Sequence, residues 1–184
     1  MVRNKKPRKR KCRICKKWIE KPRSTLQVVC STKCAIEKTN LDKAKKRRKE
    51  DAKARERLKP RSQWLRETQA VFNKFIRERD SLEPCISCSR HHHGQYHAGH
   101  FYTTAARPDL RFGDRGEDNC HKQCSACNSH LSGNIHNYRE NLIKKIGQER
   151  VDALEVVGRS DWDIDEIKAI KEKYKQKIKE LKDA

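Results

Sequence analysis

The sequence predicts a small, zinc-stabilised α+β protein made of separate modules, and three observations support this fold class. Only 34% of its 184 residues are hydrophobic, whereas 39% are charged. An ordinary globular domain has roughly 25% charged residues, so one large core is excluded. Eight of the nine cysteines fall in closely spaced pairs, and small modules with thin cores commonly depend on a metal. The predicted parts are a basic tail (1–11), an N-terminal zinc ribbon (12–34), a long basic helix (35–59), a module of two strands and a helix with a leading helix (60–136), and C-terminal helices (137–184).

The charge of the chain favours a polyanionic partner. Lysine and arginine number 46 against 25 acidic residues, so the formal net charge is +21. This balance is typical of proteins that bind nucleic acid, and a generic basic surface is the alternative. No stretch approaches the roughly 18 apolar residues of a membrane span, and the basic N-terminus lacks the apolar segment of a secretory signal. Cysteines spaced for metal indicate a reducing compartment. We expect a cytoplasmic protein with no membrane partner and no small-molecule substrate.

Two cysteine pairs near the N-terminus predict a small zinc ribbon. Cys12 and Cys15 form the first pair, and Cys30 and Cys34 follow after fourteen residues. These spacings are typical of four-cysteine zinc sites. The residues expected to supply the minimal core are Trp18, Ile19, Val28 and Val29. The tail before the ribbon has no apolar periodicity, so we expect it to stay disordered until it meets nucleic acid.

Residues 35–59 predict a helix that is polar on all sides. Lys, Arg, Glu and Ala dominate this segment, and they are good helix formers. Such a helix is either a connector or a charged arm. Its residues expected to contact the DNA phosphate backbone are Lys45, Lys46, Arg47 and Arg48. A solvated linker between two modules is the alternative, and the two roles are compatible.

A helix with an apolar face is predicted directly before the central module. Pro60 ends the basic helix, and Ser62 is the expected cap of the next one. Its residues at helical spacing are Trp64, Leu65, Thr68, Val71, Phe72, Phe75 and Ile76. We expect this face to pack on the module that follows.

Three helices are predicted after the central module. Gly147 and Gly158 are the expected ends of the first two, and Ser160 or Asp161 is the expected cap of the last. The stripe of the last helix is Ile167, Ile170, Tyr174, Ile178 and Leu181. Because such a stripe packs either on the module or on a second subunit, a homodimer stays open.

The central module is bracketed by a second set of metal-spaced cysteines. The four residues are Cys85, Cys88, Cys124 and Cys127, and two Cys-x-x-Cys pairs complete a structural zinc site. Between them we predict strands at Gln95–Phe101 and Asp109–Phe112. The polar segment Gly113–Asn119 is expected to be a loop, and the chain is expected to turn helical near Cys124.

The residues between the cysteine pairs suit phosphodiester hydrolysis. This reaction needs an activated water, a held phosphate and a neutralised leaving oxygen, tasks for imidazole and a divalent ion. His97 and His100 are expected to supply a metal ligand and a general base from one strand. Asn119 is expected to hold the loop or orient the base, and Asn128 to direct an oxygen toward the same ion.

The pattern of His100, Asn119 and Asn128 with flanking Cys-x-x-Cys pairs resembles the HNH endonuclease motif in its variant ending in Asn. HNH enzymes use a ββα-metal fold with one catalytic divalent ion. The chain is still more similar to the phage NinG (Rap) recombination proteins, over nearly its whole length. The segments that carry this resemblance are Lys59–Ser62, Phe75–Asp80, Pro84–Cys88, Ala98–His100, Thr103–Ala106, Leu110–Phe112, His121–Cys124, Cys127–Asn128 and Ser132–Asn134.

The resemblance implies a structure-specific endonuclease that cuts branched recombination intermediates, such as Holliday junctions and D-loops, in the cytoplasm of a phage-infected host. It implies an HNH-like module, with His100 as general base and Asn119 as orienting residue. His97 and Asn128 would be ligands of a catalytic Mg²⁺ or Mn²⁺, with His121 a further candidate, in addition to two structural Zn²⁺ ions.

Two positions depart from the family pattern. Gly99 stands where HNH motifs usually place an acidic or histidine ligand, and His97 stands where NinG relatives commonly have Asp. We expect imidazole in place of carboxylate to shift the metal preference from Mg²⁺ toward Mn²⁺ or another transition ion, or to weaken the activity.

Other polar residues of the module have less specific expectations. His91, His92 and His93 are expected to form an exposed loop, and Cys120 to pack as a small apolar side chain. His130 and His136 are expected on a polar helix face. The residues expected to grip phosphates are Arg107, Arg111, Arg115 and Lys122.

Two other functions compete with the nuclease. A non-catalytic zinc protein that binds DNA or RNA would explain the charge and the cysteines equally well, but it leaves the His and Asn residues without a role. A zinc-stabilised protein-interaction scaffold would use the last helix, but it makes poor use of the charge of +21.

Overall fold

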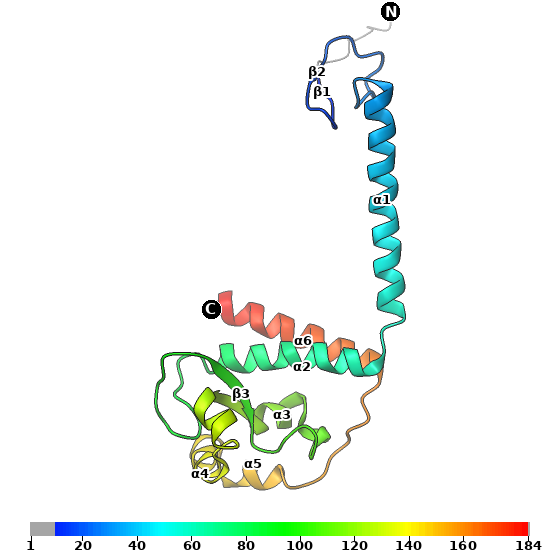
Figure 1. Cartoon of the computed structure of the whole chain (residues 1–184). Helices are drawn as coiled ribbons and strands as arrows, with labels where there is room; N and C mark the ends of the chain where they lie inside the picture. Colours follow the sequence, from blue (N-terminus) through cyan, green and yellow to red (C-terminus); the bar gives the residue numbers. More distant parts are fainter. Residues whose placement is uncertain (1–9, 184) are drawn as a thin grey trace, which may run out of the picture. The chain divides into compact units, whose positions relative to one another are not determined.

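The structure is a computed structural model that describes residues 10–183 (Figure 1). It divides into two compact units, Met1–Lys59 and Pro60–Ala184. The tail predicted over residues 1–11 falls outside the described residues except for its last two. Among residues 10–183, none of the helices combines the length and apolar composition that a membrane crossing requires.

The first unit consists of a two-stranded ribbon and one long helix. Strand β1 (Arg10–Lys11) pairs antiparallel with β2 (Trp18–Ile19), so the last two residues of the predicted tail belong to the ribbon. The small core contains Ile19, with Ile14 and Val29 packed against two cysteines. The prediction that Trp18 supplies this core is wrong, because its side chain is 58% exposed and lies under the Lys11 ammonium.

Helix α1 (Thr32–Arg57) follows the ribbon. Ser31 caps it, and the Ser31 hydroxyl accepts a hydrogen bond from the backbone N–H of Cys34. Cys34 is the buried residue of this helix, so the helix that the sequence predicts without an apolar face is confirmed. The four basic residues at positions 45–48 are exposed.

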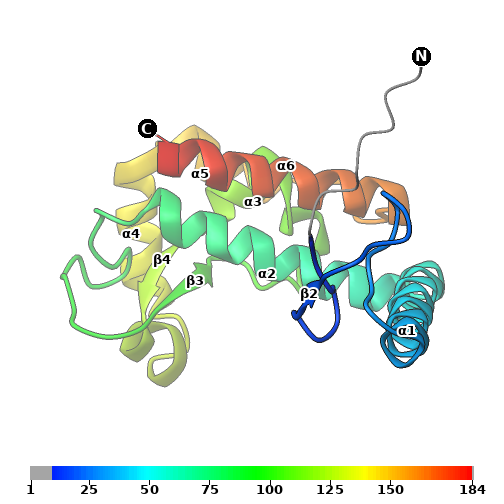
Figure 2. The same cartoon turned by 90° about the horizontal axis from the view of Figure 1, so that it is seen from above.

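The second unit contains a β-hairpin between two layers of helices. Its elements are α2 (Arg61–Arg79), β3 (Tyr96–His100), the 3-10 turn η1 (Pro108–Leu110), α3 (Gly113–Asn119), β4 (Cys120–Cys124), the π-helical turn η2 (Ala126–His130), α4 (Ile135–Ile146), α5 (Gln148–Ala153) and α6 (Ile164–Asp183). Helices α2 and α6 lie side by side, as Figures 1 and 2 both show, and α2 also packs on the hairpin. A small α+β protein is thus confirmed.

Two cores hold this unit together, one on each side of the hairpin. The first joins α2 and α6 through Phe72, Phe75, Ile76, Phe112, Cys120, Tyr174 and Ile178. The second joins the turn at residues 85–88, called the 85–88 knuckle below, to α4 and α5. Its residues are Ile86, Phe101, Leu110, Tyr138, Leu142, Val151 and Leu154. The prediction that Cys120 packs as a small apolar residue is confirmed, since its side chain is fully buried in the first core.

The hairpin corrects the predicted strands. The strand predicted at Gln95–Phe101 forms β3, but Asp109–Phe112 is not a strand, because Pro108 starts a 3-10 turn there. The partner of β3 is β4, whose five residues are all buried although their sequence is polar. The predicted loop at Gly113–Asn119 is helix α3. Burial on both faces removes the alternation by which a strand is usually identified.

Helix ends also differ from two of the predicted caps. Pro60, rather than Ser62, is the residue before α2. The cap of α6 is Asp163, whose carboxylate accepts from the backbone N–H of Glu166 at 2.7 Å while the Glu166 carboxylate accepts from the Asp163 N–H at 2.8 Å. This reciprocal capping box replaces the predicted cap at positions 160–161. Gly147 ends α4 with a positive φ of 88°, as predicted.

Candidate functional site

Two four-cysteine clusters could each hold a metal ion. The first contains Cys12, Cys15, Cys30 and Cys34, and the second contains Cys85, Cys88, Cys124 and Cys127. Within each cluster the four sulfur atoms lie within 4.8 Å of one another. A tetrahedral Zn²⁺ with bonds of about 2.3 Å separates its sulfur ligands by roughly 3.8 Å. The donor sets therefore fit structural zinc.

The second cluster shows the polar contacts expected around zinc thiolates. Backbone N–H groups of Cys124 and Cys127 point at the sulfur atoms of Cys85 and Cys124, at 3.4 and 3.5 Å. His92 lies in the exposed loop 91–93, as predicted, and its Nε2 is 3.1 Å from the Cys88 sulfur. Such outer contacts orient metal ligands. The cluster thereby fixes the end of β4 against the 85–88 knuckle.

Asn119 holds the segment after β3 through both ends of its side-chain amide. Its Oδ1 accepts from the Tyr102 N–H at 2.8 Å, and its Nδ2 donates to the Tyr102 carbonyl at 2.9 Å. The side chain is fully buried. Of its two predicted roles, this geometry matches holding the loop, because both hydrogen bonds of the amide go to the Tyr102 backbone.

Replacing Asn119 by Ala should destabilise the second unit by about 2–4 kcal/mol, because both backbone groups of Tyr102 lose their buried partner. Asn128→Ala is the matched control. Asn128 is partly exposed, and its side chain makes no hydrogen bond within residues 10–183, so we expect a change within about 0.5 kcal/mol. Urea unfolding of both variants measures the difference, and equal losses would contradict the role of Asn119.

His100 is held as a neutral imidazole at the end of β3. Burial lowers its pKa to about 4, and the positive charge of Arg111 acts in the same direction, whereas a hydrogen bond to the Ala98 backbone opposes them. The Nε2 atom of Gln69 on α2 lies 3.4 Å from His100 Nε2. The Phe72 ring lies beside the imidazole, with 6.4 Å between ring centroids. An unprotonated imidazole at neutral pH is what a general base requires.

His97, a predicted ligand of the catalytic ion, lies on the opposite face of β3 from His100. His97 is three residues earlier on a regular strand, and residues an odd number of positions apart point to opposite faces. His97 therefore shares the face of Gln123, whose amide donates to the Ser87 hydroxyl. Position 99 also faces that side, where a Cβ would overlap the Gln123 side chain. This close approach explains why position 99 is glycine, where HNH motifs usually place an acidic or histidine ligand.

His121 is committed to a buried network of charges. Its Nδ1 accepts from Arg79 Nη2 at 2.9 Å, and its Nε2 donates to the Asp118 carbonyl at 3.1 Å. Burial lowers the pKa of His121 although neighbouring Asp80 opposes the shift. With both ring nitrogens engaged, His121 does not fit as a metal ligand. The assignment of His97 and Asn128 as ligands stays a prediction.

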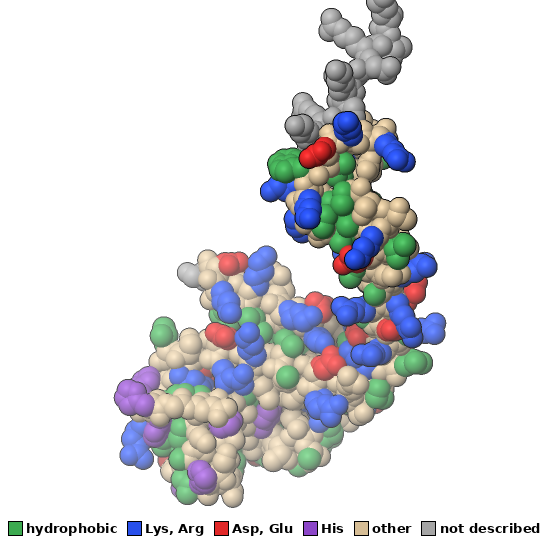
Figure 3. Space-filling model, turned by 45° about the horizontal axis from the view of Figure 1, so that its top comes forward, with side chains coloured by type: hydrophobic (Ala, Val, Ile, Leu, Met, Phe, Trp, Pro, Cys, Tyr) green, Lys and Arg blue, Asp and Glu red, His purple; other side chains and the backbone are tan. Residues whose placement is uncertain are grey.

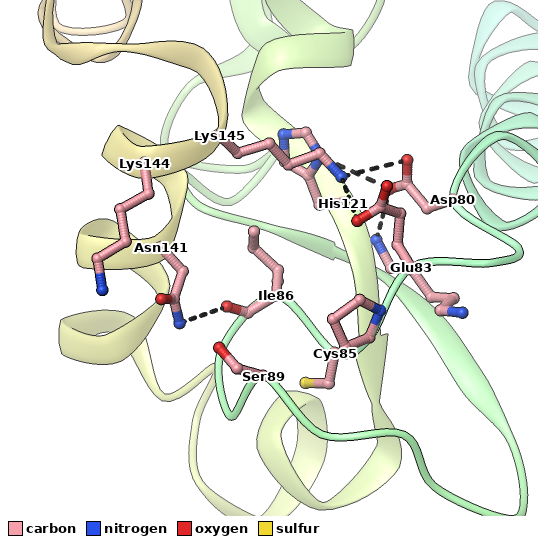
Figure 4. Close-up of a pocket in the computed structure, with 11 residues that line it drawn as sticks. Asp80, Glu83, Cys85, Ile86, Ser89, His121, Asn141, Lys144 and Lys145 are labelled. Carbon is pink, nitrogen blue, oxygen red and sulfur yellow. Dashed lines mark hydrogen bonds and ion pairs between the residues drawn. The ribbon is translucent and has the colours of Figure 1, made fainter.

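Asp80 is the anion of this network. Burial would raise the pKa of Asp80, but the adjacent His121 ring and the hydrogen bonds from Arg79 hold it below the ordinary value. Figure 4 shows the Asp80 and His121 side chains at one end of a pocket of about 280 Å³, with Lys145 reaching toward Asp80 and Glu83. The charged side chains that line this pocket pair with one another, and these pairs link the end of α2 to β4 and α4. The sequence analysis assigned Asp80 no role, since one Asp after a helix carries no specific signal.

The four arginine and lysine residues predicted to grip phosphates differ in their availability. Arg107 and Arg115 both contact the buried Asp109 carboxylate, and both donate to the Val156 carbonyl. Lys122 is buried and donates to the Ser81 carbonyl at 2.8 Å. Arg111 is the one of the three arginines that forms no ion pair within residues 10–183. Figure 3 shows many other lysine and arginine side chains spread over the visible face.

Comparison with known proteins identifies relatives over the whole length of the chain. A family model described as the bacteriophage lambda NinG protein matches residues 4–184. Proteins named ninG from Escherichia phages 933W and lambda are each 44% identical to this chain, covering 97% of it and 96% of the relative. The ninG protein of Salmonella phage P22 is 42% identical, covering 96% and 95%. No solved structure gives a significant match. The chain therefore belongs to the NinG family of bacteriophage proteins.

Proposed function

We propose that this protein is an HNH-type, structure-specific endonuclease that hydrolyses phosphodiester bonds in branched DNA during phage recombination. The observation that carries the proposal is the environment of His100, a neutral imidazole on a hairpin that ends in a four-cysteine cluster, with Arg111 close by. Membership of the NinG family and the net charge of +21 support a DNA substrate. The same proposal places the protein in the cytoplasm of the host cell.

In the proposed reaction His100 takes a proton from water, and the resulting hydroxide attacks the phosphorus atom. A new P–O bond forms, the bond to the leaving sugar oxygen breaks, and that oxygen gains a proton. The neutral form of His100 is ready for the first step near pH 7. Asn119 contributes indirectly, because it fixes the Tyr102 backbone just beyond the base.

The proposal includes a requirement for Mg²⁺ or Mn²⁺, which would stabilise negative charge on the leaving oxygen when bound. Asn128 and His97 are the candidate ligands whose side chains make no hydrogen bond within residues 10–183. His97 lies on the opposite face of β3 from His100, so the proposal assigns the ion no place. The requirement is tested by omitting the added ion, since a chelator would also remove structural zinc.

The experiment compares a labelled four-way DNA junction with a linear duplex of the same sequence, with Mg²⁺, with Mn²⁺ and without either ion. We expect cleavage of the junction, little cleavage of the duplex, and none without the ion. Tight binding with no cleavage under any condition would instead favour the non-catalytic zinc protein that binds DNA or RNA. The charge and the two cysteine clusters favour that second candidate equally.

A further inference from the structure

Three buried polar side-chain atoms of this unit have no hydrogen-bond partner. They are Gln69 Oε1, Arg111 Nε and Trp162 Nε1, and they make up all such side-chain atoms in the described part of the chain. Burying an unpartnered polar group is unfavourable, so a native structure rarely retains several without a reason. Gln69 contacts His100 directly, and Arg111 is close enough for its charge to lower the His100 pKa.

Trp162 connects to the same neighbourhood from the segment before α6. Its ring packs edge-on against Phe112, with 6.1 Å between centroids, and Phe112 packs on Phe72 at 5.9 Å. The Trp162 carbonyl accepts a hydrogen bond from Arg61 Nε at 2.7 Å. The chain thus brings the start of α2, the turn after η1 and the segment before α6 together around the face of β3 that carries His100.

Two guanidinium groups in this neighbourhood have no carboxylate partner. Arg111 makes one long hydrogen bond, from Nη2 to the Thr104 carbonyl at 3.5 Å. Burial lowers the pKa of Arg111, and the positive charge of Arg61 lowers it further, with no acidic group opposing them. Arg61 itself is exposed and forms no ion pair among residues 10–183.

Five other arginines of this unit differ from these two. Arg79, Arg107, Arg115, Arg150 and Arg159 each pair with a carboxylate. Two unpaired guanidinium groups that repel one another are stabilised when an anion lies between them, and guanidinium geometry matches two oxygens of a phosphate.

We propose that Arg111 and Arg61 together bind a phosphate of the DNA backbone beside His100, and that Gln69 positions the His100 imidazole. The role of this phosphate site in cleavage rests on the proposed nuclease function, but phosphate binding itself does not depend on catalysis. It adds Arg61 and Gln69, to which the sequence analysis assigns no role, and it separates Arg111 from the arginines that serve the fold. The expected ligand class is a single phosphodiester of DNA.

The test titrates the full chain with a thymidine dinucleotide that contains one phosphodiester, at constant ionic strength and without a divalent ion. The readout is the indole N–H resonance of Trp162 in a proton–nitrogen NMR spectrum, assigned with Trp162→Phe. We expect this resonance to shift with saturable binding. Arg111→Gln should remove the shift, and Arg111→Lys should retain part of the shift. Arg61→Gln should weaken binding by about tenfold.

Arg66→Gln is the matched control, because Arg66 is exposed on the same helix as Arg61, and it should leave the titration unchanged. No shift in the wild-type protein, or a shift unaffected by both Arg111→Gln and Arg61→Gln, would overturn the phosphate site. Junction cleavage would be untouched by that result. Conversely, a saturable shift in a protein that cuts no DNA would uphold the phosphate site and reject the nuclease.

Discussion

Replacing Cys124 by Ser should reduce the zinc content from about two ions to about one per chain and unfold much of the second unit. Cys124 ends β4 and supplies one of the four sulfur atoms of the second cluster. Structural zinc contributes directly to folding, with apparent binding free energies of about 10–16 kcal/mol. We therefore expect the free energy of unfolding to fall by more than about 4 kcal/mol. Elemental analysis and urea unfolding measure the two effects.

Cys120→Ala is the matched control on the same strand. Cys120 is equally buried but belongs to the apolar core rather than to a cysteine cluster. It should retain both zinc ions and lose only about 1 kcal/mol through the small cavity that it leaves. A Cys124→Ser variant that still binds two ions and unfolds like the wild type would contradict the structural role of this cluster.

Replacing His100 by Ala should slow junction cleavage by between about 100-fold and 10,000-fold, the range that general acid–base catalysis contributes. Affinity for the junction should stay within about twofold, because His100 is neutral and is not expected to attract phosphate. His93→Ala is the control, since His93 is an exposed histidine of the same module. Single-turnover cleavage and equilibrium binding, measured side by side, separate the two quantities.

The pH dependence of cleavage follows from the same environment. Because burial lowers the pKa of His100 to about 4, the base stays unprotonated from about pH 5 upward. Protonation of His100 should therefore not reduce the rate between pH 7 and 5.5, and the loss should begin only as the pH approaches 4. A rate that falls with an apparent pKa near 6.5 would instead indicate a solvent-exposed histidine.

Much of the fold could be predicted from spacing and periodicity. The two cysteine clusters, α1, the apolar faces of α2 and α6, and β3 all follow from short-range patterns. Strand β4 could not be predicted in this way, because Cys-His-Lys-Gln-Cys contains no apolar alternation and is buried by partners distant in sequence. The 3-10 turn at Pro108 was mistaken for a strand because Leu110 and Phe112, both buried, alternate with polar residues.

The residue types of the candidate site could be predicted from the sequence, but the directions of their side chains could not. Residues such as His97 and His100 are close in sequence, yet the pleat of β3 separates their side chains, and only the register with β4 shows which face each occupies. Arg107 and Arg111 look equivalent in the sequence. The buried carboxylate of Asp109 forms an ion pair with Arg107, whereas Arg111 has only a long hydrogen bond to the Thr104 carbonyl. Gln69 reaches His100 from a helix 31 positions away.

The most direct test of the central claim is whether free imidazole restores junction cleavage by His100→Ala. Single-turnover cleavage of a labelled four-way junction would be measured with Mg²⁺ or Mn²⁺, with and without imidazole at constant pH and ionic strength. If His100 supplies the base, imidazole should raise the rate of this variant at least about tenfold while leaving the wild-type rate unchanged. Wild-type activity in the His100→Ala variant before any imidazole is added would contradict the account.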